Sequence, residues 1–140
     1  MITVKFENPP GNILSTRVFT PGQGLRVGAY VTGPLGLGEP FIPVRFELYG
    51  DKFTDYYADT IATVQGNAWV DWILPNVITP AKVRITAFYP IGSDEIVEIP
   101  IGIGQEAPPI IPPGDTSWMW AVGIGVVLIL GAFAYSKGSR

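Results

Sequence analysis

The strongest constraint on the fold is a strict alternation of apolar and polar side chains, repeated in short runs between residues 2 and 103. The run Ile2–Glu7 is followed by similar runs at 25–32, 42–49, 68–74 and 82–89. Because successive side chains of a strand point to opposite faces, each run predicts a strand with one buried face. Turns rich in Pro and Gly separate the runs, and no segment before residue 117 has a helical period with caps. The pattern predicts an all-β fold, an antiparallel two-sheet β-sandwich over residues 1–103.

The turns and strands follow one another in an order that is found in a known class of module. A Pro-Gly turn precedes one strand, a strand that begins with Pro-Val ends at a glycine, and a turn containing Gly leads into a strand that ends in Leu-Pro. The residues concerned are Pro21, Gly22, Leu25, Val27, Pro43, Val44, Phe46, Leu48, Gly50, Thr63, Gly66, Ala68, Val70, Leu74, Pro75, Val83, Ile85, Thr86 and Ala87. Over residues 2–103 the chain resembles the Ig-like modules of bacterial and archaeal surface proteins and the macroglobulin-type domains. The resemblance implies an Ig-like sandwich and transfers no catalytic residue.

A second constraint is the uncharged, Pro-free run from Trp118 to Tyr135. At about 1.5 Å per residue its 18 residues form a helix of roughly 27 Å, close to the hydrocarbon thickness of a bilayer. We therefore expect a transmembrane α-helix over residues 117–136 and a short cationic tail over 137–140. Aromatic rings at the ends of the run and two cations after it complete the expected membrane anchor: Trp118, Trp120, Tyr135, Lys137 and Arg140.

The apolar run allows other interpretations, and small residues along it could form a packing face. It could instead be buried in a soluble protein, or sheathed by protein in a fibre or capsid. Small residues lie along it at Ala121, Gly125 and Ala132, a spacing that permits close packing against another helix or a second copy. The cations after the run place the tail inside and the N-terminal domain outside.

Residues 104–116 contain four prolines in 13 residues, which favours an extended, semi-rigid linker, although a PxxP docking motif is an alternative. The N-terminus has no basic region or apolar stretch typical of a signal peptide. Either a leader has been removed, or the C-terminal helix is the targeting element.

Composition excludes several functions. The chain has no Cys and no His, which removes thiolate nucleophiles, imidazole bases and the common zinc and iron sites. A net charge of −3 argues against nucleic acid as a partner. Glu95 and Glu98, near Asp94, could form a carboxylate pair for glycoside hydrolysis, but the chain leaves little room for a substrate groove. We expect no cofactor and no enzymatic activity.

Two groups of residues on the expected domain are candidate sites. Asp51, Asp55 and Asp59 recur every four residues and are a weak candidate for Ca²⁺, with solvated loop charges as the alternative.

The other group is aromatic. Phe53, Tyr56 and Tyr57 are expected in a loop at one end of the sandwich, where they could bind a glycan or a protein, or cover the edge of the fold. Trp69 and Trp72 fall on opposite faces of one strand, and we expect Trp69 to be the one that contacts an adjoining subunit.

These observations predict a non-catalytic structural subunit of a larger membrane-associated assembly, which presents an Ig-like domain on a single-span anchor. The assembly would be the virion of a membrane-containing virus or phage, or a complex of the cell envelope. The expected partners are the lipid bilayer and other protein subunits, with copies of the same chain as one option. The alternatives are a membrane-anchored adhesion or receptor-binding module that uses the aromatic loop, and an accessory subunit of an integral membrane complex.

Overall fold

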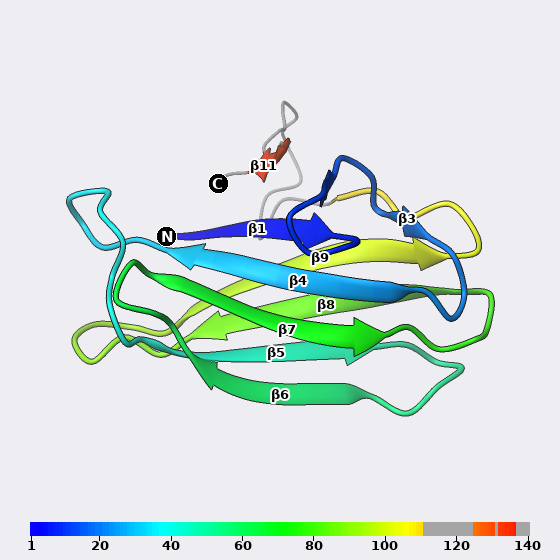
Figure 1. Ribbon diagram of the computed structural model, residues 1–140, viewed down its shortest axis with the longest axis horizontal. Helices are drawn as coiled ribbons and strands as arrows, with labels where there is room; N and C mark the ends of the chain where they lie inside the picture. The colour runs from blue at the N-terminus through cyan, green and yellow to red at the C-terminus, as the bar shows by residue number, and fades with distance from the viewer. Residues whose placement is uncertain (111–124, 131, 137–140) are drawn as a thin grey trace.

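The computed structural model describes residues 1–110 with their side chains, and the backbone alone of residues 125–130 and 132–136. Residues 1–103 contain nine strands: β1 (Ile2–Glu7), β2 (Ile13–Leu14), β3 (Val18–Phe19), β4 (Gly24–Val31), β5 (Pro43–Tyr49), β6 (Tyr56–Ile61), β7 (Asn67–Ile73), β8 (Thr79–Ala87) and β9 (Glu95–Ile103). Figure 1 shows them as two layers with the longer strands running along the same axis.

One sheet has the strand order β2-β1-β4-β7 and the other has the order β3-β9-β8-β5-β6. All the neighbouring strands in these two sheets are antiparallel except β3 and β9, which are parallel. The expected all-β fold with two sheets in a sandwich-like arrangement is therefore confirmed.

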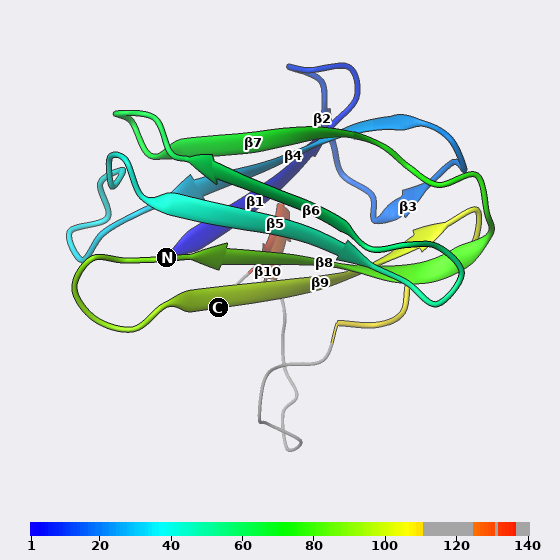
Figure 2. The same cartoon turned by 90° about the horizontal axis from the view of Figure 1, so that it is seen from below.

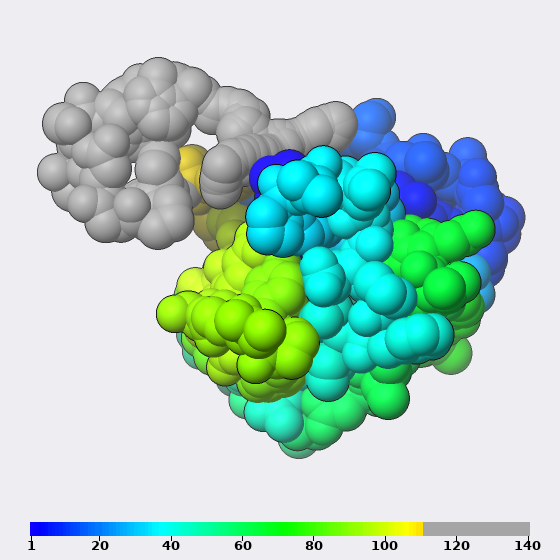
Figure 3. All heavy atoms as spheres, turned by 90° about the vertical axis from the view of Figure 1, so that its left-hand side faces the viewer, coloured from blue at the N-terminus to red at the C-terminus, as the bar shows by residue number. Residues whose placement is uncertain are grey.

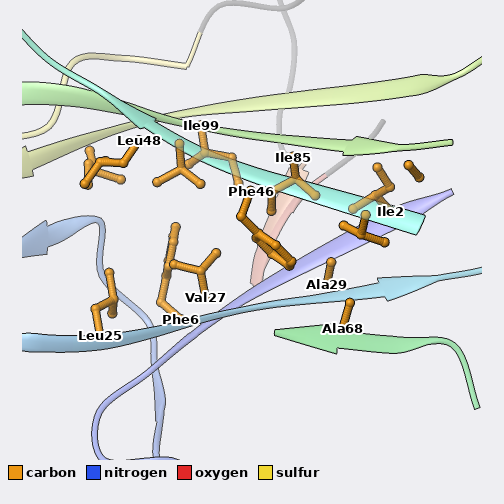
Figure 4. Close-up of a cluster of buried hydrophobic side chains, with 14 of the residues drawn as sticks. Ile2, Phe6, Leu25, Val27, Ala29, Phe46, Leu48, Ala68, Ile85 and Ile99 are labelled. Atoms are coloured by element: carbon orange, nitrogen blue, oxygen red, sulfur yellow. The ribbon is translucent and has the colours of Figure 1, made fainter. Parts of the chain in front are cut away.

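The core lies between the sheets and consists of the inward-facing residues of each strand (Figure 4). In β4 these are Leu25, Val27, Ala29 and Val31, which are all buried, as the period of two requires. Facing them from the other sheet are the buried side chains Val44, Phe46, Leu48, Val83, Ile85, Ile99, Ile101 and Ile103. The hydrophobic effect on these apolar faces explains why the alternating runs form strands.

After β9 the chain turns at Gly104, which has a φ of 70°, and runs back along the domain. Arg17 Nη1 donates to the carbonyl oxygens of Pro100 and Pro108, at 2.6 and 2.8 Å. The first residues of the expected linker 104–116 are therefore attached to the sandwich at Pro108.

Two further strands, β10 (Gly125–Leu130) and β11 (Ala132–Ser136), pair antiparallel with each other. The expected membrane span 117–136 overlaps these strands and otherwise falls outside the described residues, as do Trp118, Trp120, Ala121 and the tail 137–140. No helix in the described residues is long and apolar enough to cross a membrane. The span and its anchor and packing residues stay predictions.

Candidate interaction surfaces

Three connections meet at one end of the sandwich and expose a group of apolar side chains. They are the β4–β5 loop, the β6–β7 turn and the β8–β9 loop, which lie together at the left in Figure 1. We define the apolar end as their exposed residues Leu35, Leu37, Phe41, Val64 and Ile91. Leu35 and Ile91 are 87% and 91% exposed, so these side chains project from the surface. Figure 3 looks onto this end, where the cyan β4–β5 loop and the yellow-green β8–β9 loop lie side by side.

Backbone hydrogen bonds hold the β4–β5 loop against the β6–β7 turn. Val31 N donates to Gly66 O at 2.8 Å, and Glu39 N donates to Val31 O at 2.8 Å. Gly66 has a φ of 89°, and a Cβ there would lie 2.6 Å from Val31 O, so only glycine permits this close approach. Both connections are thus bonded to Val31, the last residue of β4.

Phe41 is held in an unusual conformation at this end. Its φ is 61°, in the left-handed region that residues with a Cβ rarely occupy. Its N–H donates to Ala62 O at 3.1 Å, and the next residue, Ile42, is buried in the core. The ring is 64% exposed. Backbone bonding and the burial of Ile42 therefore hold a strained residue that presents its ring to solvent.

The β8–β9 loop is tied to the start of β1. The amino group of Met1 donates to Thr32 O at 2.6 Å and lies 3.1 Å from Glu95 Oε1, and Tyr89 Oη donates to the same carboxylate oxygen at 2.8 Å. Burial and the hydrogen bond to Glu95 together raise the pKa of Tyr89 well above its usual range. These contacts connect the start of the chain, the β4–β5 loop and the β8–β9 loop.

The predicted aromatic cluster is divided between the inside and the outside of the fold. Phe53 packs edge-on against Tyr56 with ring centroids 5.9 Å apart, and Tyr56 packs edge-on against Trp72 at 5.6 Å. Tyr56 Oη also donates to Ile73 O at 2.6 Å, which joins the β6 edge of one sheet to the β7 edge of the other. Tyr57 points to the opposite face. Phe53 and Tyr56 therefore cover the side of the core between the two edges, which was one of the two expected roles.

Tyr57 and Asp59 belong to the outer face of the five-stranded sheet. Arg45 lies 4.8 Å from the Tyr57 ring and 2.9 Å from Asp59 Oδ1, and Tyr57 Oη donates to Asp59 at 3.0 Å. The hydrogen bond from Arg45 lowers the pKa of Asp59. Within the described residues no group of three acidic side chains is placed to hold a metal ion, so the structure gives no support to Asp51, Asp55 and Asp59 as the weak Ca²⁺ candidate.

The outer face of the four-stranded sheet carries Trp69, which is 46% exposed, while Trp72 points inward against the core. The Arg26 guanidinium lies 5.5 Å from the centre of the Trp69 ring. Arg26 also makes two hydrogen bonds to Asp71, from Nε at 2.7 Å and from Nη2 at 2.9 Å. These bonds lower the pKa of Asp71.

The carboxylates considered for hydrolysis are kept apart. Glu95 bonds the chain start near the apolar end, whereas Glu98 accepts from Arg84 at 2.6 Å and lies 3.5 Å from Lys82. Burial raises the pKa of Glu98, but hydrogen bonding and charge from Arg84 and Lys82 outweigh it and leave the pKa below its usual range. Because their separation of three residues puts them on opposite faces of β9, the two side chains do not face a common substrate position.

Sequence reasoning did not single out the residues of the apolar end. The signal was present in the segment GPLGLGEPF, where leucine and phenylalanine occur in a Gly- and Pro-rich connection that has no strand to bury them. What the sequence could not show is that Val64 and Ile91, from two other connections, lie at the same end.

The fold defines an all-β, two-sheet domain with an apolar end. The chain matches no protein-family model and no curated protein sequence. Among solved structures it is similar to the soluble domain of PmoD from Methylocystis sp. ATCC 49242 (Rockwell), with a TM-score of 0.51 and 10% sequence identity. The similarity covers 74% of this chain and 91% of the PmoD domain. At this identity the likeness concerns the fold alone.

Proposed function

We propose that this chain is a non-catalytic structural subunit of a larger membrane-associated assembly, and that its apolar end contacts a neighbouring subunit. The observation that carries the proposal is the projection of Leu35, Leu37, Phe41, Val64 and Ile91 from three connections at one end of the sandwich. A group of exposed apolar side chains at one site is typical of an interaction surface, because leaving them in water is unfavourable.

Charge indicates the kind of surface that fits the apolar end. The three connections, residues 32–42, 62–66 and 88–94, contain Glu39 and Asp94 but neither Lys nor Arg. A partner with apolar sockets and basic groups around them would complement this end. The proposed subunit has an Ig-like type of sandwich, which the resemblance implies, and a single C-terminal membrane span, which the apolar run at residues 118–135 favours. The assembly would be a membrane-containing virion or a cell-envelope complex.

The test is recovery of the full-length chain in its native assembly after gentle solubilisation of the membrane. The double variant Leu35→Ser/Ile91→Ser should no longer be recovered with the assembly, although it remains folded and in the membrane. The matched control is Ile13→Ser in β2, because Ile13 is 62% exposed at the opposite end. If the double variant is recovered in the same amount as the control, the proposed contact does not exist.

The adhesion alternative rested on the aromatic loop. Because Phe53 and Tyr56 pack against the core, Tyr57 is the ring of that cluster whose exposed face could contact a ligand. Specific glycan or receptor binding that is lost in Tyr57→Ala would favour the alternative over the structural role.

A further inference from the structure

The edges of the two sheets differ in length. In residues 1–110 the edge strands are β2 and β7 in one sheet and β3 and β6 in the other. β2 and β3 have two residues each, whereas β6 has six and β7 has seven. Very short edge strands discourage pairing with another chain, while long ones offer a template for it. β6 and β7 lie on the same side of the molecule, which Figure 2 shows from below.

Hydrogen bonds at the two ends of β7 establish which of its backbone groups face away from β4. Thr63 N donates to Asn67 O, and Tyr56 Oη donates to Ile73 O, so the odd-numbered residues of β7 direct their polar groups outward. Because these groups alternate in direction along an antiparallel strand, the N–H and C=O of Trp69 and Asp71 also face outward. Within residues 1–110, bonds from the domain thus occupy the carbonyls of Asn67 and Ile73 and leave the outward groups of Trp69 and Asp71 open.

The side chains of β7 do little to discourage pairing. The strand NAWVDWI contains no Lys and no Pro, the residues that most often protect an edge. Its one charged residue, Asp71, is already bound by two hydrogen bonds from Arg26. Trp69 and Ile73 leave apolar area exposed on the outer face of the strand.

We propose that β7 pairs antiparallel with β7 of a second copy of this chain, about a two-fold axis at Val70. In this register Trp69 lies opposite Asp71 of the second copy, and Asp71 lies opposite Trp69 of the second copy. All the open N–H and C=O groups of the two residues are then paired, and the two four-stranded sheets become one sheet of eight strands. This inference does not depend on the apolar end.

The sequence of β7 suits a second copy because its open groups are self-complementary in the central register. In β6 the residues facing away from β5 are Tyr57, Asp59 and Ile61, so the two-fold register that pairs all three of them centres on Asp59. Two-fold pairing there puts Asp59 directly opposite its own copy, and like charges in that position are destabilising. In β7 the carboxylate of Asp71 instead faces the Trp69 ring of the other chain. Charge therefore favours β7 over β6 for self-association.

The first test uses the absence of native cysteine, which makes a single introduced thiol unambiguous. Val70 meets its own copy at the axis as a non-hydrogen-bonded pair, with a Cα separation of about 4.5 Å, a distance that a disulfide can span. Ile73 is three residues along the same strand, so it lies roughly 20 Å from its copy in the proposed dimer. In the full-length chain in detergent, Val70→Cys should form a disulfide-linked dimer at least about tenfold faster than Ile73→Cys. Equal rates for the two variants overturn the proposal.

The second test separates the backbone from the side chain. Asp71→Pro removes the outward N–H that the dimer uses, while the bonds between β4 and β7 do not involve that group. Asp71→Ala loses the same carboxylate but keeps the N–H. Sedimentation should show the dimer in Asp71→Ala and its loss in Asp71→Pro, with far-UV circular dichroism confirming that both variants fold. A dimer that persists in a folded Asp71→Pro variant contradicts the proposed pairing, and so does a wild-type chain that remains monomeric.

Discussion

Phe41 offers a direct test of whether the backbone at the apolar end is strained. Its φ of 61° disfavours a residue with a Cβ by about 1–2 kcal/mol. Glycine removes that strain but loses about 0.5–1 kcal/mol through the greater freedom of the unfolded chain. The ring is 64% exposed, so about a third of its surface is buried. Because fully burying a Phe side chain contributes about 1.5–3 kcal/mol, truncating this ring should cost about 0.5–1 kcal/mol.

These magnitudes predict different results for two truncations of the same side chain. Phe41→Ala keeps the strain and loses the packing, so its free energy of unfolding should fall by about 0.5–1 kcal/mol. Phe41→Gly loses the same packing but relieves the strain, so it should match the wild type and exceed Phe41→Ala by about 0.5–1 kcal/mol. Urea unfolding of residues 1–110, followed by Trp fluorescence, measures both. A glycine variant less stable than the alanine variant would refute the reasoning.

Further predictions concern other contacts of the same domain. Tyr56→Phe removes the hydroxyl that donates to Ile73 O, and the free energy of unfolding in urea should fall by about 1 kcal/mol; an unchanged value would contradict a bond across the two edges. The bonds from Arg26 lower the pKa of Asp71 in the folded state, so the stability they contribute is fully present above about pH 4 and is lost as the pH falls through that lowered pKa. Asp71→Asn should therefore flatten the acid side of the stability curve, and a curve identical to that of the wild type would show that the pair contributes nothing. Deleting residues 117–140 should release a soluble, folded domain, and a truncated chain that stays in the membrane pellet would contradict the two-part organisation.

The fold could be predicted from the sequence because buried side chains recur at every second residue of each strand. In β5 the residues Val44, Phe46 and Leu48 are buried, and those between them are partly exposed. The pattern says which side of a strand is buried, and Pro and Gly say where the strand ends. Two sheets then follow, because each strand has one apolar face to cover.

The edge strands were harder to predict, because one or both of their faces lie in contact with water. The sequence predicts a weaker strand around residues 58–64, whereas β6 occupies Tyr56–Ile61. β2 and β3, at two residues each, are too short to show any period. The earlier start of β6 also explains the division of the aromatic cluster: Tyr56 and Tyr57 are consecutive strand residues, so they must point in opposite directions.

The candidate surfaces depended on topology that the sequence does not contain. The exposure of Trp69 followed from its position in the alternating run, and the structure places it on the outer face, away from Trp72. The apolar end required knowing that three connections, separated by some twenty to thirty residues, meet at one end. The open edge of β7 required the sheet order, which pairs β7 with β4 and leaves its other side without a strand in the described residues.

The central claim is that the apolar end contacts a neighbouring protein subunit, and photo-crosslinking in the native membrane tests it most directly. A photoreactive amino acid would be placed at position 35 or 91, with position 13 at the opposite end as the control. We expect crosslinks to another protein of the assembly from positions 35 and 91 and none from position 13. Crosslinks from positions 35 and 91 to lipid alone, or to protein from position 13 alone, would contradict it.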